Sequence, residues 1–144
     1  MSSTDGPGGS DWLGNLRDNL RDVLPDADRS DTTTVIEVRG ASPVQRADLV
    51  TRLESEHERP VFRLTPGDLV AAPHERAAAA LRLLDAAEVA GAIPMLDAVD
   101  DLLPDRAAAV ALEDRLRTFP GVVVLSNHGP SRLAAVVTKS LHPE

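Results

Sequence analysis

Short apolar runs alternate with longer helical patterns along most of this chain, and this alternation constrains the fold more than any other feature. The runs predict strands at 34–38, 61–64, 92–96 and 122–126. Each run is mainly apolar rather than strictly alternating, which is typical of strands buried on both faces. Helical patterns cover 43–57, 73–90, the stretch after Pro104 to Arg117, and 131–141. The order predicts an α/β fold, a three-layer sandwich with a mainly parallel sheet.

Two residues, Gly91 and Pro94, bear on where the predicted helices and strands end. Gly91 follows the helical stretch 73–90 and is predicted to cap it, because glycine readily adopts the left-handed conformation of a helix end. Pro94 lies inside the third run and has no N–H to donate to a strand ladder, so the prediction of that strand is the weakest of the four.

The first 33 residues differ in composition from the rest. Residues 1–10 hold little that a core could bury and are predicted to be disordered. Residues 11–24 predict an amphipathic helix with apolar anchors at helical spacing, and residues 25–33 predict a polar linker to a domain at 34–144. The anchors can pack on the domain's own core or in a partner's groove; they are Trp12, Leu13, Leu16 and Leu20.

Composition excludes several classes of protein. The 144 residues suffice for one domain, and the absence of cysteine rules out disulfides and thiolate metal sites. Asp and Glu outnumber Lys and Arg by 23 to 15, a charge of -8 that disfavours nucleic-acid binding. Because no apolar run approaches the ~20 residues of a membrane helix and no signal peptide is recognised, we expect a cytoplasmic protein without a membrane partner.

Candidate site residues follow three of the predicted strands. Gly40 follows the first, Asp97 the third, and Asn127 the fourth. Ligands of open parallel sheets bind beyond the carboxyl ends of the strands, so these residues are expected to meet at one edge. Nucleotide hydrolysis uses residues of these three kinds: a glycine turn that binds phosphates, an acid that helps to hold magnesium, and an amide that positions water.

The order and spacing of these segments resemble the large α/β part of AAA+ ATPases, a family of P-loop NTPases. RAAAALRLLDAAEVAGAIPMLDAVDDLL resembles that family's Walker B strand with its flanking segments, and RTFPGVVVLSNHG resembles its sensor-1 strand. The resemblance covers roughly Thr34 to Leu141 and does not include the family's helical lid. It implies a P-loop NTPase-like fold without the lid.

The family's Walker A motif, GxxxxGK followed by Ser or Thr, is degraded here. Gly40 matches the first glycine, but Gln45, Arg46 and Ala47 occupy the next three conserved positions. Gln45 puts a side chain where the backbone must approach phosphate. Arg46 keeps the charge but not the compact ammonium, and Ala47 has no oxygen for magnesium.

The Walker B and sensor positions are partly retained. Asp97 matches the family's aspartate, Ala98 stands where the catalytic glutamate is expected, and Asn127 matches the sensor asparagine. Without a general base nothing activates the attacking water. The resemblance therefore implies a pseudo-ATPase with Asp97 and Asn127 as remnants, without bound ATP or magnesium and without a metal site.

Three functions remain open from the sequence. The first is a non-catalytic, structural or regulatory subunit whose partner is a protein, either an active AAA+ ATPase or a large assembly. The second is a divergent ATP-binding protein or weak ATPase that uses Arg46, Asp97 and Asn127. The third is a receiver-like signalling domain with Asp97 as phosphoacceptor, although the first strand ends without the pair of acids that would hold magnesium.

Overall fold

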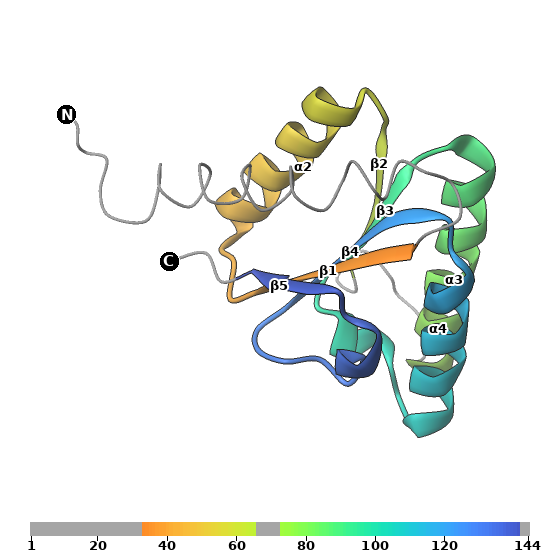
Figure 1. Ribbon diagram of the computed structural model, residues 1–144. Helices are drawn as coiled ribbons and strands as arrows, with labels where there is room; N and C mark the ends of the chain where they lie inside the picture. The colour runs from red at the N-terminus through yellow and green to blue at the C-terminus, as the bar shows by residue number, and fades with distance from the viewer. Residues whose placement is uncertain (1–32, 66–72, 142–144) are drawn as a thin grey trace.

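The chain forms a five-stranded, all-parallel sheet with helices on both faces, which confirms the predicted α/β class (Figure 1). A computed structural model describes residues 33–65 and 73–141. The strand order is β2-β3-β4-β1-β5. The strands are β1 (Thr33–Arg39), β2 (Val61–Leu64), β3 (Ile93–Leu96), β4 (Gly121–Asn127) and β5 (Lys139–Leu141). The helices are α2 (Pro43–His57), α3 (Pro73–Ala90) and α4 (Arg106–Thr118), with short 3-10 turns η2 (Val99–Leu102) and η3 (Ala134–Val136).

The longest strands, β1 and β4, form the centre of the sheet. They pair in parallel over their whole length, from Thr33 opposite Gly121 to Arg39 opposite Asn127. Their interiors are buried on both faces, as the β-branched runs of the sequence predict. Both strands extend beyond the predicted ranges, because each continues to pair with the other at its ends.

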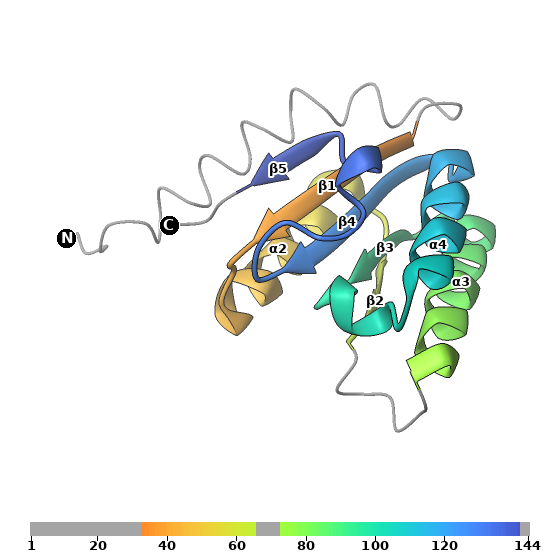
Figure 2. The ribbon, with the colours of Figure 1, turned by 90° about the horizontal axis from the view of Figure 1, so that it is seen from below.

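Alternate side chains of these strands enter two separate cores. Ile36 and Val124 face α2 and pack with its Leu49 and Leu53. Val35, Val123 and Leu125 face the opposite side, where α3 and α4 supply Leu84, Leu112 and Leu116. Figure 2 shows α3 and α4 side by side on that face. The helices therefore cover both faces of the sheet, an arrangement consistent with a three-layer α/β sandwich.

A charged contact joins the two helices of the second face. Arg115 of α4 donates to Asp85 at 3.0 Å and to Glu88 at 2.5 Å, both on α3. Its guanidinium carbon also lies 5.6 Å from the centre of the Phe119 ring. Burial disfavours the charged form of Arg115, but its hydrogen bonds to Glu88 and Asp85 and their negative charges outweigh burial and raise the pKa of Arg115.

Gly91 and Pro94 are both accommodated by the backbone around β3. Gly91 has a φ of 69°, the left-handed conformation that the cap prediction requires. The N–H of Ile93 points to the side of β2, where it donates to the carbonyl oxygen of Pro60, the residue before that strand. The backbone nitrogen of the next residue, Pro94, therefore points to the side of β4. Pairing with β4 begins only at Met95, so the missing N–H of Pro94 costs no ladder bond.

The prediction of a helix over 131–141 is wrong. That stretch contains the 3-10 turn η3 and then β5, which pairs in parallel with β1 from Ile36 opposite Lys139 to Val38 opposite Leu141. Thr138 exchanges two hydrogen bonds with the backbone of Val35. On its side away from β4, β1 has backbone N–H and C=O groups that a helix at 131–141 would leave without hydrogen bonds. Pairing these groups with β5 stabilises the chain more than the local helical pattern would.

The predictions for residues 1–10 and 11–24 lie outside the described part of the chain, as do the anchors Trp12, Leu13, Leu16 and Leu20. The linker predicted at 25–33 also lies outside it except for Thr33, which belongs to β1. Within the described residues, no helix is long and apolar enough to cross a membrane.

Leu53 gives a test of the packing of α2. Its side chain is fully buried, so Leu53→Ala should lower the free energy of unfolding by about 2–5 kcal/mol through lost burial and a residual cavity. Val44 on the same helix is 70% exposed, and Val44→Ala should change it by less than about 0.5 kcal/mol. Urea unfolding of both variants measures the difference. Equal effects would show that α2 does not pack as described.

Candidate functional site

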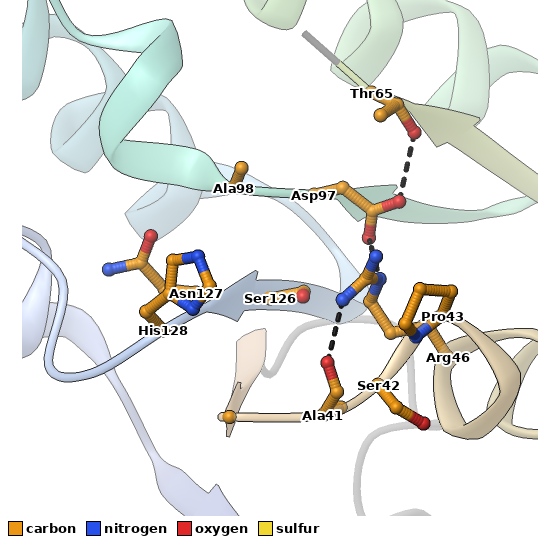
Figure 3. Close-up of a pocket in the computed structure, with 11 residues that line it drawn as sticks. Ala41, Ser42, Pro43, Arg46, Thr65, Asp97, Ala98, Ser126, Asn127 and His128 are labelled. Carbon is orange, nitrogen blue, oxygen red and sulfur yellow. Dashed lines mark hydrogen bonds and ion pairs between the residues drawn. The ribbon is translucent and has the colours of Figure 1, made fainter. Parts of the chain in front are cut away.

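A hollow of about 390 Å³ opens at the carboxyl edge of the sheet (Figure 3). The chain leaves β1 towards α2 on one face and leaves β4 towards η3 on the other, so the hollow lies at a topological switch point. Gly40, Arg46, Asp97 and Asn127 all line it, whereas Gln45 and Ala47 do not. The remaining lining residues are Ala41, Ser42, Pro43, Thr65, Ala98, Ser126 and His128.

Gly40 turns the chain from β1 towards α2. Its φ of 73° lies in the left-handed region, which glycine adopts without strain. Its N–H donates to the carbonyl oxygen of Asn127 at 2.9 Å, which holds the turn against the end of β4. The sequence prediction of a turn that brings these two strand ends together agrees with this contact.

The start of α2 is closed by its own side chains. Ser42 is the N-cap, and its hydroxyl accepts from the Gln45 N–H at 3.1 Å. The Gln45 side chain in turn accepts from the Ser42 N–H at 2.8 Å, which completes a capping box. Pro43, the first residue of the helix, has no N–H. Three backbone positions that would face an anion at a helix N-terminus therefore offer it no free donor.

Arg46 takes the place of the expected lysine and is held inside the hollow (Figure 3). Its Nη1 donates to the carbonyl oxygen of Ala41 at 2.7 Å. Its Nε lies 3.9 Å from Oδ1 of Asp97, close enough for an ion pair and too far for a hydrogen bond. The guanidinium thus bridges the loop before α2 and the end of β3.

Asp97 is 2% exposed and receives its strongest contacts from β2 and the residue that follows it. Its Oδ2 accepts from Arg63 Nε at 2.5 Å and from the Thr65 hydroxyl at 2.9 Å. Sequence reasoning missed both partners, although Arg63 is the single polar residue of β2. Among the described residues, its Oδ1 has no hydrogen-bond partner and faces Arg46 Nε, which has none either.

Ala98, in the position of the expected glutamate, has an unusual backbone conformation. Its φ of 45° is in the left-handed region, which is unfavourable for a residue with a Cβ. Ala98 is the N-cap of η2, which starts at the next residue. The methyl group of Ala98 lines the wall and offers no base to a water molecule.

Asn127 lies at the hollow, but its amide contacts the neighbouring loops. Its Nδ2 donates to Asp100 Oδ2 and to the carbonyl oxygen of Gly129, both at 3.2 Å. The second carboxylate oxygen of Asp100 accepts from the Arg132 N–H at 3.0 Å. The amide therefore joins the end of β4 to η2.

A second buried acid lies next to this edge. Glu37 is 0% exposed, and its carboxylate accepts from Arg39 Nε at 2.6 Å and from both the hydroxyl and the N–H of Ser131. The sequence shows Glu37 only as an interruption of an apolar run. Its contacts attach the connection between β4 and β5 to β1, so its role is to hold the chain in place.

The part of the chain that the structure describes contains no group of three or more His, Cys, Asp or Glu residues arranged to hold a metal ion. No protein-family model matches the chain, and no curated protein matches its sequence.

The capping box can be tested by removing its hydroxyl. Ser42→Ala should lower the free energy of unfolding by about 1 kcal/mol, because the Gln45 N–H loses its acceptor. Ser55→Ala, at an exposed position within α2, should be neutral or slightly stabilising, because alanine favours helix. Chemical unfolding of the two variants measures both effects. No loss in Ser42→Ala would mean that the start of α2 is not closed in this way.

Proposed function

We propose that this chain is a non-catalytic domain of the AAA+ type that acts as an interaction, structural or regulatory subunit. The observation that carries the proposal is the closed start of α2, where a nucleotide phosphate would have to bind. The N–H groups of Ser42 and Gln45 donate to each other's side chains, and Pro43 has no N–H.

Support for the relationship to P-loop NTPases comes from the placement of three strand ends. β4 lies between β1 and β3 in the sheet, so the residues after these strands face one hollow. Gly40, Asp97 and Asn127 occupy those positions, in the roles of loop, acid and amide that the sequence resemblance assigns. Their placement suits a domain that retains the strand topology of a P-loop NTPase but lacks the residues needed for hydrolysis.

The side chains of the hollow argue against hydrolysis. Arg46 donates to Ala41 and pairs with Asp97. Asp97 uses Oδ2 on Arg63 and Thr65, so that oxygen is already engaged. General-base activation of water needs a group within hydrogen-bond reach, and Ala98 supplies none.

The proposed role requires a protein partner. An active AAA+ ATPase or a large multiprotein assembly in the cytoplasm is the partner that the resemblance favours. Nucleic acid is disfavoured by the charge of -8. The apolar anchors Trp12, Leu13, Leu16 and Leu20 remain part of the proposed contact surface.

The proposal is tested by thermal unfolding with ATP and magnesium. A ligand at 100 times its dissociation constant adds about 2.7 kcal/mol to the free energy of unfolding, so a true nucleotide site would raise the melting temperature clearly. We expect no change for this chain at millimolar ATP. The matched variant Gln45→Gly/Arg46→Lys/Ala47→Thr restores the Walker A residues and shows whether the hollow itself can take nucleotide. An ATP-dependent rise in the unsubstituted chain would contradict the proposal.

A divergent ATP-binding protein is the second candidate, and the hollow itself favours it, because it opens where a nucleotide would bind and contains Arg46. If this candidate were correct, phosphate release from ATP by the intact chain would exceed that of Asp97→Ala. We expect equal release, at the level of buffer alone.

The receiver-like alternative is disfavoured because Asp97 is 2% exposed and its Oδ2 has two donors.

A further inference from the structure

We propose that the hollow at the carboxyl edge binds a neutral carboxamide group, carried either by a free small molecule or by an asparagine or glutamine side chain of a partner protein. The inference rests on the proposed function, because it requires a hollow that nucleotide does not occupy.

The hydroxyl of Ser126 is a buried polar group without a partner. Ser126 is 3% exposed and ends the row of β4 side chains, Val122 and Val124, that face α2. Within residues 33–65 and 73–141, no hydrogen bond to its hydroxyl is found. Buried hydroxyl groups are normally hydrogen-bonded. Because Ser126 lines the hollow, a ligand there can supply the missing partner (Figure 3).

Arg46 provides a second group with hydrogen-bonding capacity to spare. Its side chain is 26% exposed, and its Nη1 donates to the carbonyl oxygen of Ala41. For Nη2, no hydrogen bond is found in the described part of the chain, and this nitrogen is not among the fully buried ones. Nη2 can therefore donate to an oxygen atom that enters the hollow.

The charges that line the hollow cancel. Arg46 and Asp97 are the lining residues with a full charge, and Arg46 Nε lies 3.9 Å from Asp97 Oδ1. Arg63 contacts Asp97 from β2 and does not line the hollow. A carboxylate or phosphate would lie close to Asp97, and an ammonium group would lie close to Arg46, so either ion meets a like charge. The lining therefore favours a neutral ligand.

A carboxamide matches the polarity of the hollow. Figure 3 shows Asp97 on one side, the loop that leads into α2 on the other, and Arg46 between them. The first turn of α2 holds no acidic residue, so that side also carries the positive end of the helix dipole. A carboxamide has an oxygen that accepts and an NH₂ group that donates. Its oxygen would accept from Arg46 Nη2, and its NH₂ group would donate to Ser126 on the side of Asp97.

The size and the apolar part of the wall suit a carboxamide on a short aliphatic stem. The volume of about 390 Å³ lies at the low end of the ~300–1,000 Å³ typical of ligand pockets. Ala41, Pro43 and Ala98 supply apolar wall. Both a small free amide and a glutamine side chain have CH₂ groups that can lie against this wall.

The test compares three probes of nearly equal shape, which are propionamide, propionate and propylamine. At about pH 7.5 the second is an anion and the third a cation. Each is titrated into the intact chain, and the backbone NMR signals of Gly40 and Ala98, which line the hollow, are followed. We expect propionamide to shift these signals with a dissociation constant of about 1–10 mM, a reasonable affinity for so small a ligand. The charged probes should bind at least about tenfold more weakly, because each meets a like charge.

Ser126→Ala tests the proposed contact directly. It should weaken propionamide binding about fivefold, the loss expected for one neutral hydrogen bond, and it removes a hydroxyl that has no bond to lose within the described residues. Thr51→Ala is the matched control, because Thr51 is an exposed residue of α2 and does not line the hollow. Its affinity for propionamide should stay within about twofold of the unsubstituted chain. Equal affinity for the three probes, or an equal effect of the two substitutions, overturns this inference.

A peptide of alternating glycine and glutamine distinguishes the two sources of the carboxamide. If it shifts the same signals and binds more tightly than propionamide, the ligand is a side chain of a partner. If propionamide binds and the peptide does not, the ligand is a free small molecule. Absence of binding by both overturns the inference, and the proposed function survives that result if ATP leaves the melting temperature unchanged. If ATP raises the melting temperature and displaces propionamide, both are overturned.

Discussion

The parallel pairing of β1 with β4 is the constraint on which the rest of this structure depends. A parallel pair cannot be closed by a tight turn, so the chain between the two strands must cross over the sheet. Here that crossover contains α2, β2, α3, β3 and α4, and it places helices on both faces. The same pairing brings Arg39 beside Asn127 and so sets the edge at which the hollow opens.

The buried acids at this edge show how the protein maintains charge inside an apolar framework. Glu37 and Asp97 would each be costly to bury alone, and each has an arginine within hydrogen-bond distance and a hydroxyl as a further donor. The contacts of Asp97 join β3 to β2 and α2, and those of Glu37 join β1 to the connection before β5. Groups in such networks stabilise the positions of the loops that they join.

Residue-level reasoning succeeded where local chemistry decides the outcome. The bounds of α2 match the helical stretch predicted at 43–57, and the predicted cap at Gly91 is a backbone effect within a few residues. It failed at 131–141, where the helical pattern is genuine but the open edge of β1 required a fifth strand. It also missed Arg63 and Thr65, because their partner Asp97 lies more than thirty residues away in sequence.

By itself, the sequence determined the α/β class and the four main strands, because burial pattern and residue identity are local properties. It also placed Gly40, Asp97 and Asn127 at strand ends that had to meet, because parallel strands share one carboxyl edge. Only the tertiary structure decided what those residues do. Gln45 closes the start of α2, Arg46 pairs with Asp97, and Asn127 contacts Asp100, since each of these outcomes depends on which groups the crossovers bring within about 3–4 Å of one another.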